Sequence, residues 1–147
     1  MKKVIVRLPS DKAASEKIIN AASGYFISDF IGPNDNLNEP SLQEFSVASA
    51  DDIERIRKAV ESGAKAVKIE TRDWRVIPLE NIISLVSGKA VLYAEAKSVE
   101  DAVMLEGVLE KGVDGIIISP KSVEELASYV DALGIGRSSV KYSMMEL

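Results

Sequence analysis

The sequence predicts an α/β fold in which a parallel sheet is built from alternating strands and helices. Short apolar runs alternate with stretches of helical spacing along most of the chain. The apolar runs are almost continuously hydrophobic, as in parallel strands that are covered on both faces. Capping residues precede the helical stretches and glycines follow several of them. This alternation is typical of parallel sheets with right-handed crossovers.

The first part of the chain contains two predicted strands and one helix. Val4 to Leu8 is a β-branched strand, and Pro9-Ser10-Asp11 supplies a turn and a helix N-cap. Ala13 to Ala22 then forms a helix that ends near a glycine. Tyr25 to Phe30 is the second strand. Gly32 to Ser41 is a loop, because it is rich in proline, asparagine and aspartate.

The remaining elements follow the same rule. The predicted strands are Phe45 to Ser49, Ala64 to Glu70, Ala90 to Ala96 and Val113 to Ser119, with Ser139 to Met145 as a final candidate. The predicted helices run from Ser49 or Asp51 to Glu61, from Leu79 to Val86, from Ser98 to Lys111 and from Ser122 to Leu133. Gly112 and Gly134 are expected to be helix C-caps.

Composition limits the classes of protein and of chemistry. A chain of 147 residues is expected to form one domain, residues 1–147. The net charge of −5 and dispersed basic residues argue against nucleic acid or an anionic membrane as a partner. The apolar run at the amino terminus, Val4 to Val6 before Arg7, is too short for a signal peptide or a membrane span, so we expect a cytoplasmic protein.

The chain has no cysteine and no histidine. Disulfides, thiolate nucleophiles and the commonest metal ligands are therefore excluded, and no metal site is expected. Acid–base work must fall to lysine, carboxylates, tyrosine or water.

The run ETRDWRVIPLENII, Glu70 to Ile83, follows a predicted strand and contains the only tryptophan. Together with Ala94-Glu95-Ala96-Lys97 and the run LEKGVDG, Leu109 to Gly115, it resembles the archaeal-type 3-dehydroquinate synthases (dehydroquinate synthase II). The likeness extends from about Phe45 to about Leu133. It is weaker from Val4 to Gly24 and does not cover Tyr25 to Glu44.

The resemblance implies a barrel-like N-terminal domain that is shortened by about two βα units near residues 25–44. It also implies that the strand-rich C-terminal domain of the family is absent. We therefore expect an open or incomplete TIM-barrel-like sheet, completed by a partner chain or a second copy, because a full barrel needs about 200 residues or more. An open doubly wound, flavodoxin-like sheet is the alternative.

The reaction implied by the resemblance joins aspartate semialdehyde to a deoxy-keto sugar phosphate. It also uses NAD for an oxidative deamination that gives 3-dehydroquinate, in aromatic amino-acid biosynthesis. The substrate is thus a small phosphorylated or carboxylated carbonyl compound. Two alternatives are a non-catalytic ligand-binding or subunit module and a cut-down Schiff-base aldolase or lyase.

Alternation along the strands places several charged side chains on one face of the sheet. These residues are expected to meet near the carboxyl ends of the strands, where parallel α/β folds bind ligands: Arg7, Lys68, Glu70, Glu95 and Lys97, with Arg72 and Asp73 on the loop above.

Each of these side chains has an expected role. Lys68, with a lowered pKa, would attack a carbonyl to form an imine, and Glu95 would transfer protons. Glu70 joins them as a catalytic candidate because it lies inside the family-like run. The substrate-binding candidates are Arg7, Arg72, Asp73 and Lys97. The alternative is a purely structural role, in which Lys68 forms an ion pair with Glu70 or extends its side chain to the rim of the sheet.

Two glycine-containing stretches, residues 112–115 and 134–137, do not lie between a strand and a following helix, as a dinucleotide-binding motif would. Ser119-Pro120-Lys121-Ser122, by contrast, leads into a predicted helix N-terminus. Ser119, Lys121 and Ser122 are therefore candidates for phosphate binding, and an N-cap serine alone is the alternative explanation.

Overall fold

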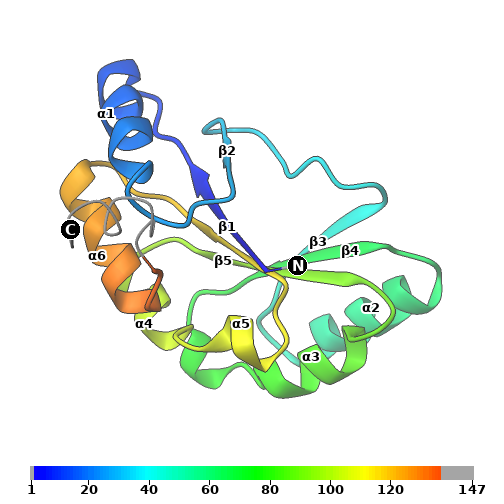
Figure 1. Ribbon diagram of the computed structural model, residues 1–147. Helices are drawn as coiled ribbons and strands as arrows, with labels where there is room; N and C mark the ends of the chain where they lie inside the picture. The colour runs from blue at the N-terminus through cyan, green and yellow to red at the C-terminus, as the bar shows by residue number, and fades with distance from the viewer. Residues whose placement is uncertain (1, 137–147) are drawn as a thin grey trace, which may run out of the picture.

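The computed structural model describes residues 2–136 and contains one six-stranded, all-parallel sheet (Figure 1). The strands are β1 (Lys3–Arg7), β2 (Asp29–Ile31), β3 (Leu42–Ser46), β4 (Ala66–Glu70), β5 (Val91–Ala96) and β6 (Gly115–Ile118). The helices are α1 (Lys12–Ala22), α2 (Ala50–Glu61), the 3-10 turn η1 (Trp74–Val76), α3 (Leu79–Val86), α4 (Val99–Met104), α5 (Val108–Lys111) and α6 (Val123–Leu133). The predicted α/β class is confirmed.

The strand order across the sheet is β2-β1-β6-β5-β4-β3. Strands that follow one another in sequence therefore lie side by side, except β2 and β3, which are the two edge strands, and β1 pairs with β6 as the first and last strands of a barrel do. The circle is broken only between β2 and β3, so the sheet is an open barrel. The flavodoxin-like alternative is wrong, because that order would place β1 next to β3.

The helices lie around the outer face of the curved sheet (Figure 1). Their apolar sides and the outward residues of the strands form one large buried cluster, which includes Val6, Ile56, Ile69, Ile116 and Leu126. No helix within residues 2–136 is long and apolar enough to cross a membrane.

The inner face is covered differently. Residues 32–41, which we call the strap, connect β2 to β3 without a helix. Leu37 of the strap is buried against Ile5, Ala66, Tyr93 and Ile117 of the inner face. The strap thus supplies, at the break in the barrel, part of the apolar cover that a complete barrel obtains from side chains of all its strands.

Local capping explains most boundaries. Asp11 accepts a hydrogen bond from the Ala14 N–H at the start of α1, and Ser98 caps α4 in the same way. Ser49 and Asp52 form a capping box at α2. The predicted C-caps Gly112 and Gly134 are confirmed, and both have positive φ.

Three predicted boundaries are wrong. The third strand is Leu42–Ser46 rather than 45–49, because the N–H groups of Ala48 and Ser49 are taken up by the Asp52 carboxylate. The second strand is shorter than predicted, since residues 25–27 form a turn. The helix predicted through Lys111 breaks into α4 and α5 at Gly107, whose φ is 80°. The final candidate strand lies outside the described residues.

Candidate functional site

Charged side chains from four strands meet on the inner face of the sheet. Strand alternation positions them: Val67 and Ile69 of β4 face the helices, while Lys68 between them faces inward. The parallel register brings Glu44 of β3 opposite Lys68. On the other side, Lys68 is paired with Tyr93 of β5, and Glu95 lies two residues further along that strand. The arrangement therefore follows directly from the order and register of the strands.

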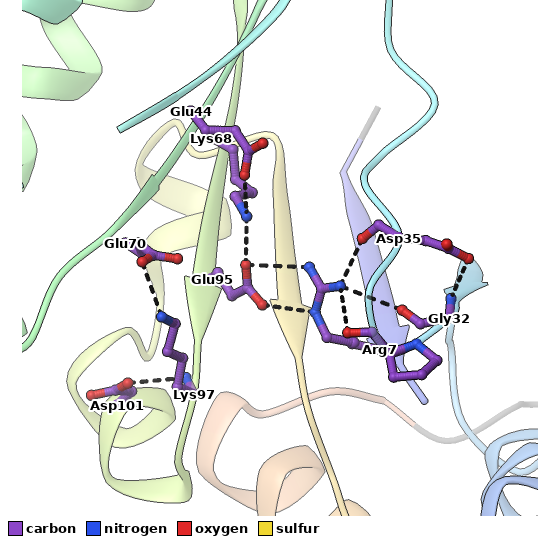
Figure 2. Close-up of polar contacts among 10 residues, drawn as sticks. Arg7, Gly32, Asp35, Glu44, Lys68, Glu70, Glu95, Lys97 and Asp101 are labelled. Carbon is purple, nitrogen blue, oxygen red and sulfur yellow. Dashed lines mark hydrogen bonds and ion pairs between the residues drawn. The ribbon is translucent and has the colours of Figure 1, made fainter. Parts of the chain in front are cut away.

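Arg7, Glu95, Lys68 and Glu44 form a chain of alternating charges, which we call the ion network (Figure 2). The Glu95 carboxylate is 2.8 Å from Lys68 Nζ and 3.0 Å from Arg7 Nε. Lys68 Nζ is also 2.8 Å from Glu44 Oε1. The side chains of Lys68 and Glu95 are each only 6% exposed. The expected meeting of Arg7, Lys68 and Glu95 at this face is thus present in the structure.

The partners of Lys68 and Glu70 differ from those expected for a purely structural role of Lys68. Lys68 does not pair with Glu70, because Glu70 Oε2 binds Lys97 Nζ at 2.9 Å. Lys68 does not extend to the rim either, since its side chain is buried. Figure 2 shows the Glu70–Lys97 pair apart from the Lys68–Glu95 pair. The predicted cluster is thus divided into a buried pair, Lys68–Glu95, and a more exposed pair, Glu70–Lys97.

Burial and pairing act in opposite directions on the ionisable groups. For Lys68, burial disfavours the charged form, but the carboxylates of Glu95 and Glu44 outweigh it and raise the pKa of the ammonium. For Glu95, burial likewise opposes the charge, but Lys68 and Arg7 prevail and lower the pKa of the carboxyl. Both groups are therefore charged at neutral pH. The lowered pKa expected of Lys68 is therefore wrong.

Arg7 also anchors the strap. Its Nη1 donates to the Asp35 carbonyl oxygen at 2.7 Å and to the carbonyl oxygens of Gly32 and Pro33 at 3.4 Å (Figure 2). A single guanidinium thus joins the ion network to the segment that crosses the break in the barrel.

A second polar cluster lies beneath the ion network and was not predicted. The Tyr93 hydroxyl donates to the carboxylate of Glu39 in the strap, and Lys3 Nζ lies 3.9 Å from the same carboxylate. The Tyr93 ring fits over Gly115 of the adjacent strand, where an added Cβ would come within 2.6 Å of it. Burial and the Glu39 carboxylate both raise the pKa of Tyr93, so its hydroxyl stays protonated.

The family-like run lies mainly outside the ion network. Trp74 is 7% exposed and belongs to the large apolar cluster between the sheet and the helices, so it has a structural role in the core. Asp73 caps η1 and pairs with Arg75. Arg72 and Asp73 line a hollow of about 310 Å³ together with Ser98 of α4. The two residues lie on the loop after β4, as expected, and substrate binding by them stays a prediction.

The N-terminus of α6 has an internal partner for its free N–H groups. Ser122 Oγ accepts from the Glu125 N–H, and the Glu125 carboxylate accepts from the Lys121 N–H. This reciprocal capping explains the serine without a ligand. Phosphate binding by Ser119, Lys121 and Ser122 stays a prediction.

The ion network can recognise an anion or stabilise developing negative charge. It has one buried cation, Lys68, and one partly buried cation, Arg7, and its Lys68 end opens at the edge of the sheet through the 42% exposed side chain of Glu44. Glu44 was not predicted as a site residue, because the third strand was predicted to begin at Phe45, whereas it begins at Leu42. Within residues 2–136, no group of three or more acidic side chains is arranged to hold a metal ion.

Comparison with known proteins gives one matching family. Residues 1–133 match the model of the 3-dehydroquinate synthase II N-terminal domain. The chain is 37% identical over 93 residues to the 3-dehydroquinate synthase of Nitrosopumilus maritimus and 39% identical over 89 residues to that of Korarchaeum cryptofilum. It is 31% identical over 100 residues to that of Methanocaldococcus jannaschii.

These alignments cover 60–67% of this chain and 26–28% of each relative, so the chain spans about a quarter of the length of the curated relatives that it matches. Among solved structures, the chain matches ribose-5-phosphate isomerase B from Giardia lamblia at 16% identity. The alignment covers 90% of this chain and 93% of the isomerase chain. Its TM-score of 0.32 supports no argument about fold or function.

Proposed function

The chain belongs to the 3-dehydroquinate synthase II family, as a match to its N-terminal domain, and on that premise we propose that it recognises the substrate in 3-dehydroquinate synthesis. The ligand would be a small carboxylated carbonyl compound of that pathway. The ion network on the inner face of the open barrel is the observation that carries the proposal.

The position of the network supports this assignment. In barrels of parallel strands, ligands bind at the carboxyl ends of the strands. Arg7 is the last residue of β1, and Glu95 is the penultimate residue of β5. Lys97, directly after β5, adds a more exposed cation held by Glu70. In the proposal, Arg7 and Lys97 hold anionic oxygens of the substrate.

The charge state of Lys68 supports one of two possible roles for this residue. An imine requires a neutral amine, whereas the raised pKa keeps this amine protonated. We therefore assign Lys68 as a fixed cation that stabilises negative charge developing on a carbonyl oxygen. The ionised Glu95 holds this ammonium in place and is the buried base beside it. Of the two steps implied by the resemblance, the condensation through a lysine imine is therefore not assigned to Lys68.

The described residues do not fit the NAD that the family resemblance implies. A dinucleotide pyrophosphate usually binds at a helix N-terminus that is free of negative charge. Here α1 is capped by Asp11, and the first turns of the other helices of eight or more residues contain carboxylates: Asp51 and Asp52 in α2, Glu80 in α3, and Glu124 and Glu125 in α6. No step is therefore derived through NAD.

One observation favours a non-catalytic binding module as a second candidate. Each charged group of the ion network already has a partner of opposite charge within it. Such a network stabilises one arrangement of the strands whether or not a reaction takes place there.

Binding and turnover separate these functions. Calorimetric titration with 3-dehydroquinate should give saturable binding that weakens at least about tenfold in Lys68→Gln, the loss of a charged hydrogen bond. Lys58→Gln removes an exposed lysine of α2 and should bind like the unchanged protein. Absence of binding by a folded protein would refute the proposal.

A second assay tests the chemistry. The protein is incubated with aspartate semialdehyde, the deoxy-keto sugar phosphate and NAD, and NADH absorbance is followed while a parallel sample receives borohydride. NADH formation with 3-dehydroquinate as product would establish the synthase activity. A reduced adduct on Lys68 would refute its role as a fixed cation, and binding without turnover would favour the binding module.

A further inference from the structure

Lys68 has two carboxylate partners that are held in different ways. Glu95 lies on an interior strand, is 6% exposed and is bound by both Lys68 and Arg7. Glu44 lies on β3, the last strand of the open sheet, is 42% exposed and has Lys68 as its partner. Lys68 Nζ forms an ion pair at 2.8 Å with each carboxylate, so exposure and the number of partners are what distinguish Glu44 from Glu95.

We propose that Glu44 is an exchangeable internal substitute for a ligand carboxylate, and that a monocarboxylate binds Lys68 by displacing it. This inference rests on the proposed function, because it specifies the anionic group recognised at the same network. Glu44 thereby becomes a residue that sets both the affinity and the charge selectivity of the site.

Exposure determines which carboxylate leaves. Glu44 can turn into solvent and be fully hydrated, so its departure costs little beyond the ion pair itself. Glu95 cannot leave without depriving the buried Lys68 and the partly buried Arg7 of their shared carboxylate, which is a much larger cost. A ligand anion therefore competes with Glu44 and leaves Glu95 in place.

The direction of entry follows from the two ends of the network. Figure 2 shows Glu44 at one end and the strap carbonyls at the other, beyond Arg7. The Glu44 end lies on the edge strand, at the break between β2 and β3. A carboxylate that arrives there meets Lys68 without releasing the strap from Arg7.

Charge favours a monoanion over a dianion. With Glu44 displaced, two cations, Lys68 and Arg7, face one remaining carboxylate, Glu95. A single negative charge restores neutrality at this buried position. A phosphate dianion would leave an excess negative charge beside Glu95, which burial penalises.

The test measures lactate binding by two-dimensional amide NMR titration at constant ionic strength, with Glu44→Gln as the main variant. If Glu44 leaves Lys68 free in about one molecule in ten, its removal should tighten lactate binding about tenfold. Glu16→Gln changes the net charge equally at an exposed position of α1 and should bind like the unchanged protein. The shifts should be centred on β3, β4 and β5.

Three further probes complete the experiment. Lactamide, which lacks the charge, should not bind, and inorganic phosphate should bind Glu44→Gln more weakly than lactate does. Lys68→Gln, once its fold is verified, should lose lactate binding, although the Glu44→Gln result decides the matter without it.

Equal lactate affinity in Glu44→Gln and the unchanged protein would overturn the proposal, as would shifts centred on the N-terminus of α6. So would tighter binding of phosphate than of lactate. Tighter lactate binding in Glu44→Gln without any binding of 3-dehydroquinate would support the exchange at Glu44 while refuting the proposed function, so the two failures are distinguishable.

Discussion

Replacing Glu95 by glutamine tests the energetics of the ion network most directly. Glutamine keeps the shape of the side chain but removes the charge shared by Lys68 and Arg7. Removing one partner of a buried ion pair typically costs about 3–5 kcal/mol. Lys68 retains Glu44 and Arg7 retains the strap carbonyls, so we expect the lower end, about 3 kcal/mol.

Urea unfolding followed by tryptophan fluorescence gives the free energy of unfolding. With a slope of about 2 kcal/mol/M, a loss of about 3 kcal/mol lowers the midpoint by about 1.5 M. Glu16→Gln, at an exposed position, should change stability by less than about 0.5 kcal/mol. A shift of the Glu95→Gln midpoint no larger than that of Glu16→Gln would refute the claim that this carboxylate compensates the charges of the buried Lys68 and the partly buried Arg7.

The same pair of proteins should show a defined pH dependence. The folded pKa of Glu95 lies below its ordinary value of 4.5, so the carboxylate's contribution is complete above about pH 5. As the pH falls below 4.5 and through the folded pKa, the carboxylate is protonated and the contribution is lost. The stability gap between the unchanged protein and Glu95→Gln should therefore narrow on acidification, and a constant gap would contradict the assignment.

Three further changes test the packing of the inner face, each by urea unfolding. Gly115→Ala should cost about 1–3 kcal/mol, because the new Cβ would meet the Tyr93 ring, and the cost should fall in a Tyr93→Leu background. Leu37→Ala should cost about 2 kcal/mol by opening a cavity under the strap, whereas the exposed Val76→Ala should cost less than about 0.5 kcal/mol. Tyr93→Phe should cost about 1–3 kcal/mol, since it leaves Glu39 without its hydroxyl donor; no change would show that this contact is not formed in solution.

The sequence determined the fold class and much of the ion network. Continuous apolar runs specify parallel strands, and the residues that interrupt them, such as Lys68 and Glu95, must face away from the helix layer. Because carboxyl ends of parallel strands gather at one edge, the meeting of Arg7 with Glu95 could be predicted without coordinates. The resemblance of the Trp74-containing run to one family was likewise readable from the sequence, and the family match agrees with it.

The pairing within the network was decided by tertiary structure. Strand alternation places Lys68 and Glu70 on the same face but does not say which carboxylate each cation reaches. Register decides that Lys68 lies opposite Glu44 and Glu70 near Lys97, because side-chain contacts across a sheet depend on offsets of one or two residues.

The protonation of Lys68 was decided in the same way. A buried lysine has a lowered pKa when desolvation dominates and a raised pKa when paired carboxylates dominate. Only the three-dimensional placement of two carboxylates at 2.8 Å from Lys68 shows that pairing prevails here. The strap was equally unpredictable as a structural element, since its contacts through Leu37 and Arg7 join segments distant in sequence that composition marks only as a loop.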